Sequence, residues 1–169
     1  MTTPQESSGW NRDPLVEVDL PRYWSTAIFT GLIAAFAALV ILRFAGDVFD
    51  TPLFVTEQGG ADELVPLTDG RVFWSVVVVN GTAAAVFNMM LYLVPNATRF
   101  FRALGTVVLI ASLLWPLSLD IGDAETAWLI AIHMVVGATI LLLLPASVGL
   151  VTRPYQRSDA TPEQSRDWA

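Results

Sequence analysis

Three polar side chains inside long apolar stretches, Asn80, Ser112 and His133, are the residues of this sequence that could do chemistry. His133 is the sole histidine, and an imidazole can carry a proton, bind a metal or exchange hydrogen bonds. Counting along helices at about 1.5 Å per residue puts all three roughly 10–12 Å below the same edge of their stretches. An unpaired polar group costs free energy in hydrocarbon. We therefore predict an intramembrane polar layer in which a neutral His133 hydrogen-bonds Asn80, Ser112 or both.

A second polar set, Asn88, Thr106 and Thr139, is expected at greater depth. It is weaker evidence for a site, because a threonine hydroxyl can bond a carbonyl of its own helix. Both sets could act as structural glue, at about 0.6 kcal/mol per hydrogen bond in a membrane. Polar groups at this depth also suggest function by default. The sequence leaves both readings open.

Cofactor binding at His133 is one such function. A single histidine permits five-coordinate haem b, His–Met ligation, or bis-histidine ligation across a dimer. Met89, Met90 and Met134 are the thioethers that could take part, although Met89 and Met90 are expected deeper than His133. Haem b on His133 is therefore an alternative, as is quinone contact with the same layer. No cofactor is predicted outright.

Other chemistries lack their residues. There is no cysteine, which removes disulfides and thiolate metal sites. The sequence also has no HExxH motif, no Ser–His–Asp candidate and no phosphate-binding glycine loop. No acidic residue lies within the long apolar stretches, which argues against a proton-coupled transporter. We predict no catalytic residue, no metal ligand and no enzyme activity.

The elements that must position the polar layer follow from composition. Apolar residues make up 54% of the 169 residues and charged residues 15%, with mean hydropathy +0.56. A soluble domain carries about 25% charged residues. This composition argues against a soluble enzyme or a nucleic-acid binder. Four stretches free of charged residues occur at 23–42, 72–98, 103–119 and 126–152. A bilayer core needs about 20 apolar helical residues to span it, so each is predicted to be a transmembrane helix.

Arginine placement predicts the orientation. Seven arginines would fall on one side of the membrane: Arg12, Arg22, Arg99, Arg102, Arg153, Arg157 and Arg166. The other side would hold Arg43 and Arg71 only. Positive residues favour the cytoplasm, so both termini are predicted to be cytoplasmic in the cell membrane. The formal charge of −7 would then lie on the outer side, where nine acids face two arginines. The acidic N-terminal segment favours a retained first helix over a signal peptide.

The predicted fold class is an all-α, up-down bundle of four transmembrane helices. The helices are expected at about 23–45, 72–94, 100–119 and 126–150, between an irregular tail (1–22) and a mobile tail (152–169). Short connections would make the last three helices antiparallel neighbours.

Small residues are expected at helix contacts, because they let backbones approach closely in lipid. Gly31, Ala34, Ala35 and Ala38 recur at helical spacing in the first span, and Gly81 and Ala85 form a pair in the second. Packing within the chain is the default, and a dimer contact is the alternative.

The 26-residue outer loop at 46–71 is long for a structureless connection. Two short apolar runs, Leu53–Val55 and Leu64–Val65, flank a turn-like stretch around Gly59 and Gly60. A small β-hairpin lid and a coil that folds against a neighbour are equally compatible with this pattern.

Aromatic side chains near the ends of the spans are predicted to anchor the helices at headgroup depth, where amphipathic rings are favoured. The predicted anchors are Tyr23, Trp24, Trp74, Tyr92, Trp115, Trp128 and Tyr155.

Two segments carry a family resemblance: Ser112–Leu117, which ends the third span, and Thr126–Gly137 in the fourth. The Ser-x-x-x-Pro turn, and an apolar run with one histidine followed by small residues, resemble an uncharacterised family of prokaryotic four-helix membrane proteins. The resemblance covers about Ser25–Val151. It implies the four-span architecture and brings no activity with it.

We therefore expect a non-enzymatic multi-pass membrane protein that is an accessory or scaffold subunit of a membrane complex. Its expected partners are the lipid bilayer and a membrane protein or second copy, and no nucleic acid. The alternative is a lipid-, quinone- or haem-binding membrane protein that uses the polar layer around His133.

Overall fold

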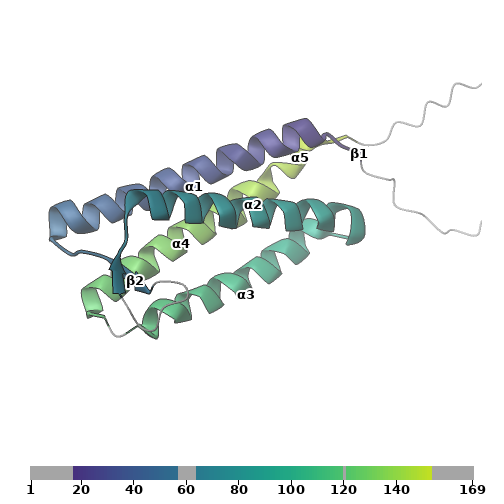
Figure 1. Ribbon diagram of the computed structural model, residues 1–169. Helices are drawn as coiled ribbons and strands as arrows, with labels where there is room; N and C mark the ends of the chain where they lie inside the picture. Colours follow the sequence, from purple (N-terminus) through teal and green to yellow (C-terminus); the bar gives the residue numbers. More distant parts are fainter. Residues whose placement is uncertain (1–16, 57–63, 120, 154–169) are drawn as a thin grey trace, which may run out of the picture.

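The computed structural model describes residues 17–56, 64–119 and 121–153, and its main elements are four long helices (Figure 1). In chain order the elements are β1 (Glu17–Val18), α1 (Leu20–Phe49), β2 (Phe54–Thr56), β3 (Leu64–Pro66), α2 (Asp69–Leu93), α3 (Ala97–Leu117), α4 (Asp123–Ala146), α5 (Val148–Val151) and β4 (Thr152–Arg153). Residues 1–16 and 154–169 of the predicted tails, the glycine turn of the loop and Tyr155 lie outside the described residues. Residues 17–22, which were expected to be irregular, hold β1 and the first turn of α1.

Helix α1 is longer than its apolar run. It begins at Leu20 because the Asp19 side chain accepts a hydrogen bond from the Arg22 backbone N–H, and proline occupies the first turn. It continues past Arg43 to Phe49 and ends where Asp50 adopts a left-handed conformation (φ 50°). Hydropathy marks only the part of a helix that suits lipid, whereas the caps decide where it begins and ends.

The other helix ends also follow local chemistry. The Thr68 hydroxyl caps the start of α2, and Asp69 lies in its first turn. Asn96, with φ 57°, links α2 to α3. Helix α4 begins at Asp123, three residues before the expected start, since Asp123 and Glu125 in the first turn suit the positive end of the helix dipole.

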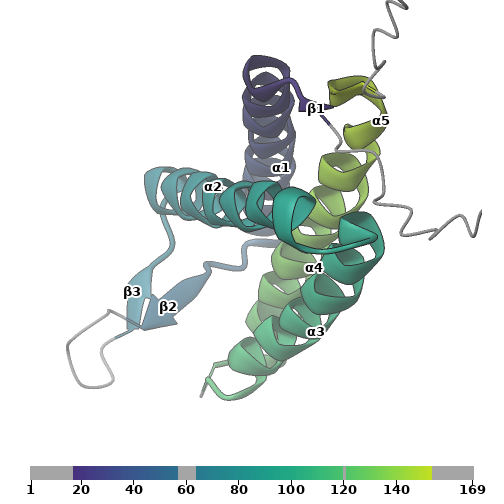
Figure 2. The same ribbon diagram turned by 90° about the vertical axis from the view of Figure 1, so that its right-hand side faces the viewer.

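The spatial order of the helices differs from their sequence order. Helix α1 packs extensively against both α2 and α4, and α3 packs mainly against α4. The contact between α2 and α3 is smaller, and that between α2 and α4 is smaller still (Figures 1 and 2). Helix α1 is therefore the central helix. The short connections between the last three helices did not predict this arrangement.

The small residues of α1 explain this central position. Ala34, Ala35, Ala38 and Ala45 are fully buried, and Gly31 is buried as well. The predicted packing of this stripe within the chain is confirmed. The pair on α2 behaves differently, because Ala85 is exposed and a Cβ added at Gly81 would meet nothing within 4 Å.

Two glycines bring α3 and α4 together. A Cβ at Gly105 of α3 would overlap the side chain of Leu141 on α4. A Cβ at Gly137 of α4 would overlap Leu109 on α3. Each helix thus packs its glycine against a leucine of the other helix. In both helices the leucine lies four residues after the glycine. Reciprocal close approach of this kind drives helix association in lipid.

Short paired strands lie at both ends of the bundle. Strands β2 and β3 pair antiparallel, with Val55 opposite Val65, so the residues that flank the turn form a hairpin, one of the two expected alternatives. Its base is joined by the backbone bond from Leu67 N–H to Leu53 O, and Leu53 is buried. Figure 2 shows the hairpin projecting sideways from the helices. At the opposite end β1 pairs with β4. We call these the hairpin end and the terminal end.

All four long helices are long and apolar enough to cross a membrane. Their outward surfaces carry many exposed large apolar side chains, among them Phe29, Phe36, Val78, Val107 and Leu142. Water would penalise so much exposed apolar surface, whereas hydrocarbon would solvate it. The four apolar helices therefore indicate a membrane protein.

Candidate functional site

Asn80 joins α2 to α1 in the interior of the bundle. It is only 5% exposed, and its Nδ2 donates a 2.9 Å hydrogen bond to the Ala27 carbonyl oxygen. The amide reaches that carbonyl because Gly31 leaves room: a Cβ there would lie 2.6 Å from Asn80 Nδ2. The Asn80 Oδ1 is buried and has no hydrogen-bond partner among the described residues. Asn80 is therefore a half-satisfied contact between two helices.

Tyr23 makes the matching bond in the other direction. Its hydroxyl donates to the Ala84 carbonyl oxygen of α2 at 2.5 Å, and its ring packs against Phe87 with centroids 6.4 Å apart. The side chain is completely buried. Tyr23 was predicted to anchor its helix at headgroup depth, and its ring lies on the inward face of α1, where it packs against α2.

His133 lies on α4 beside α3. Its Nδ1 is 2.8 Å from the Leu129 carbonyl oxygen of its own helix, and its ring centroid is 6.0 Å from that of Trp115, at an interplanar angle of 57°. A carbonyl oxygen only accepts hydrogen bonds, so Nδ1 must carry the proton of this contact. The side chain is half-buried.

Ser112, the third residue of the predicted layer, bonds its own helix. Its Oγ donates to the Leu109 carbonyl oxygen, 2.7 Å away in the same helix. The predicted hydrogen bond of His133 with Asn80 or Ser112 is therefore wrong among the described residues, since each of the three bonds a backbone carbonyl. Counting residues gives depth but not rotation about the helix axis: Asn80 faces α1, whereas His133 faces α3.

In the deeper polar set, the two threonines bond carbonyls of their own helices. Thr106 donates to Arg102 O at 2.8 Å, and Thr139 donates to Val135 O at 2.7 Å. The buried Nδ2 of Asn88 has no partner among the described residues. The threonines therefore create no contact between helices through these bonds.

The remaining expected anchors lie mostly on the outside of the bundle. Trp24, Trp74, Tyr92 and Trp115 are exposed. Trp128 is half-buried and packs against Phe44 and Phe49, with centroids 6.1 and 5.2 Å apart. This aromatic cluster links α1 and α4 at the hairpin end, a contact that the sequence analysis missed.

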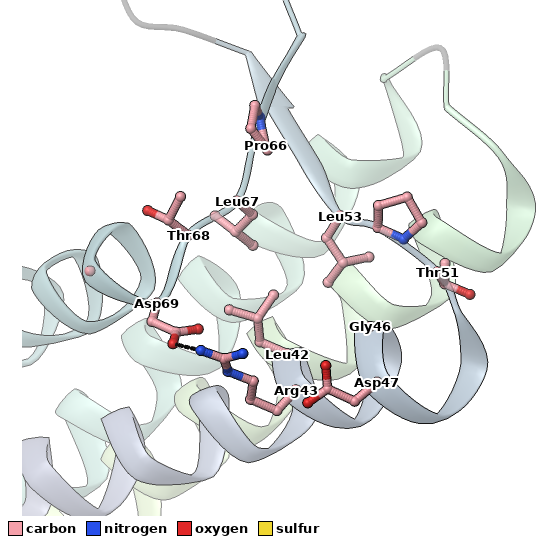
Figure 3. Close-up of a pocket in the computed structure, with 12 residues that line it drawn as sticks. Leu42, Arg43, Gly46, Asp47, Thr51, Leu53, Pro66, Leu67, Thr68 and Asp69 are labelled. Atoms are coloured by element: carbon pink, nitrogen blue, oxygen red, sulfur yellow. Dashed lines mark hydrogen bonds and ion pairs between the residues drawn. The ribbon is translucent and has the colours of Figure 1, made fainter.

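An open groove of about 480 Å³ lies at the hairpin end, between the end of α1 and the base of the hairpin (Figure 3). Arg43 forms an ion pair with Asp69 there, and Asp47 stands on the same turn of α1 as Gly46. Both charged partners are substantially exposed. The pair joins the ends of α1 and α2, and it too was missed, because Arg43 and Asp69 are 26 residues apart.

A second groove, of about 530 Å³, lies between α1 and α4 near the terminal end. It is lined by Ser25, Thr26, Phe29, Thr30, Ile33, Leu143, Ala146 and Ser147. Its four hydroxyls donate to carbonyls of their own helices. Neither groove is lined by Asn80, Ser112 or His133.

In the part of the chain that the structure describes, no group of three or more His, Cys, Asp or Glu residues could hold a metal ion. Neither a curated protein nor a solved structure matches the sequence. The model of a family of unknown function, DUF6069, matches residues 18–149, which include all four long helices. That match fits the resemblance seen in the third and fourth spans. The chain belongs to the DUF6069 family, a family of unknown function.

Proposed function

We propose that the protein is a non-enzymatic multi-pass protein of the cell membrane that serves as an accessory or scaffold subunit of a membrane complex. The observation that carries this proposal is the position of Asn80, which bonds a neighbouring helix and lines neither groove. Asn80 fills the space above Gly31, and neither groove reaches the polar layer. Tyr23 and Asn80 each bond a backbone carbonyl of the neighbouring helix, as expected of residues that fix helix packing.

The charged residues support the same role. In the described long helices the acids lie towards helix ends, and so do the arginines, which are Arg22, Arg43, Arg71, Arg99 and Arg102. No arginine or acid of the described helices lies at mid-span, where ion carriers need a charge. Short segments at both ends, with an acidic outer side, would offer contact surfaces to a neighbour.

We also propose that both termini are cytoplasmic. The pairing of β1 with β4 brings the two ends of the described chain together, as an even number of crossings requires. The excess of arginine near these ends and in the first turns of α3 favours the cytoplasm for this side.

Single-cysteine labelling tests this orientation, because the chain has no cysteine of its own. Pro95→Cys would report on the terminal end and Ala124→Cys on the hairpin end, and both positions are exposed. A membrane-impermeant maleimide should label Ala124→Cys in intact cells and Pro95→Cys only after permeabilisation. The opposite pattern would refute the proposed orientation.

Gentle purification from membranes, followed by mass spectrometry, tests the scaffold role. We expect a stoichiometric neighbour, either another membrane protein or a second copy. Gly81→Leu should reduce its recovery if the open small-residue face of α2 contributes, and the change meets no neighbouring atom at Cβ. Val79→Leu, at an exposed position on the same helix, is the matched control. A chain that is always recovered as a lone monomer would contradict the proposal.

A further inference from the structure

The hydrogen bond of His133 determines which ring nitrogen is available. Because the Leu129 carbonyl oxygen can only accept, Nδ1 carries the proton, and in a neutral imidazole Nε2 then holds a free lone pair. Among the described residues Nε2 has no hydrogen-bond partner. The atom is also not fully buried. The ring is only half-buried. A fixed, accessible acceptor therefore lies inside the apolar span.

Trp115 gives this acceptor an aromatic neighbour. The indole and imidazole centroids are 6.0 Å apart, and the planes meet at 57°, so the two rings form a wedge rather than a stack. Trp115 is 41% exposed and so keeps part of its ring free. Leu114 and Met134, next in sequence to these two residues, are exposed and apolar. The surroundings therefore favour an apolar ligand with one polar group.

The chemistry of the two side chains defines the ligand. An Nε2 lone pair accepts a hydrogen bond from a hydroxyl, and such a bond has no competing water in hydrocarbon. An indole favours an aromatic ring packed edge-to-face or with an offset. A phenolic hydroxyl on a lipid-soluble ring satisfies both requirements.

We propose that His133 and Trp115 form a binding site on the α3–α4 surface for a membrane-soluble phenol or dihydroquinone. The ligand hydroxyl donates to Nε2 of His133, and the ligand ring packs against the Trp115 indole. The Nδ1–H bond to Leu129 holds the imidazole in the accepting tautomer. This site goes beyond the scaffold role and does not rest on it: loss of a partner protein and loss of ligand binding are separate results.

Nitrogen NMR tests the site directly, because the chain has a single histidine. The protein, carrying a histidine-free affinity tag and ¹⁵N-labelled histidine, would be placed in lipid nanodiscs. The spectrum should be that of the Nδ1–H tautomer. A decyl-substituted dihydroquinone should then shift the Nε2 signal saturably, and its dimethyl ether, which has no hydroxyl donor, should not.

Variants separate the two contacts. In quenching titrations of tryptophan fluorescence, His133→Leu should weaken dihydroquinone binding by about tenfold or more, because it removes the acceptor. Trp115→Leu should weaken it to a smaller degree. The matched control is Trp74→Leu, an exposed tryptophan that contacts Phe73, and it should leave half-saturation within about twofold.

Three outcomes would overturn the proposal. The first is an Nε2–H tautomer in the free protein. The second is equal shifts from the dihydroquinone and its dimethyl ether, which would mean partition into lipid only. The third is haem that binds with a Soret band dependent on His133 while the dihydroquinone causes no shift. The wild-type NMR titration decides the matter even if a variant fails to fold.

Discussion

The α1–α2 contact and the α3–α4 contact hold the bundle together in different ways. Between α1 and α2, each helix donates a side-chain hydrogen bond to a backbone carbonyl of the other, Tyr23 to Ala84 and Asn80 to Ala27. Between α3 and α4, each helix inserts a leucine against a glycine of the other. The first contact includes directional hydrogen bonds, whereas the glycine–leucine packing of the second is steric.

This difference shows two solutions to one problem. Helices in lipid gain little from hiding apolar surface from one another, so association depends on close packing and on hydrogen bonds. Helix α1 has buried residues along its whole length and adds polar bonds to close packing. Helix α3 buries only Ala97, Phe101 and Pro116, so the glycine–leucine contacts carry more of its attachment. Substitutions at the two contacts should therefore differ in size.

The largest effect is expected at the steric contact. Gly137→Leu would place a side chain where Leu109 already lies, and overpacking of this kind costs about 1–3 kcal/mol or more. We expect a clear drop in the midpoint of detergent-induced unfolding, followed by circular dichroism. Leu109→Ala in the same chain should restore part of the loss. Gly81→Ala, in open space, is the control, and an equal loss there would refute the steric explanation.

The next largest effect is expected at Gly31, where both kinds of contact meet. Gly31→Ala puts a methyl group 2.6 Å from Asn80 Nδ2 and should displace the amide from the Ala27 carbonyl. The loss should be about 1–3 kcal/mol, because a buried polar group would lose its partner. A double-mutant cycle with Asn80→Ala measures the coupling. Strict additivity of the two substitutions would contradict the proposed contact.

Removing one polar bond alone should cost less. Tyr23→Phe deletes the hydroxyl that donates to the Ala84 carbonyl and retains the buried ring. We expect a loss of about 0.6 kcal/mol in unfolding free energy, the average for such bonds in membranes. Tyr92→Phe, on the exposed side of α2, is the matched control. A loss at Tyr23 no greater than that at Tyr92 would show that the bond contributes nothing.

The smallest effect is expected at the hairpin end. Arg43→Gln breaks the ion pair with Asp69, and exposed pairs contribute about 0–1 kcal/mol, less at high salt. Any destabilisation should disappear in high salt when unfolding is measured at both ionic strengths. Arg99→Gln serves as the control for loss of one charge. A large loss that persists in high salt would mean that Arg43 does more than pair with Asp69.

Much of the fold could be predicted from the sequence, and little of the candidate site. The apolar runs around 23–42 and 126–152 predicted helices because span length is set by bilayer thickness. Asn80, Ser112 and His133 were expected at one depth in the bilayer, but their side chains do not point towards one another. Tyr23 was expected as an anchor at headgroup depth, and the burial of its ring against α2 was not predicted.

What the amino-acid sequence determined by itself is linear: four lengths of apolar helix, the small residues that permit close packing, and the positions of the charges. What only the tertiary structure decided is rotational and spatial: α1 at the centre, Asn80 turned towards Gly31, and His133 turned towards Trp115. The physical reason is that core-facing and lipid-facing positions are both apolar in a membrane protein. Hydropathy therefore reveals that a helix spans the bilayer, but the neighbouring helices decide which way each side chain points.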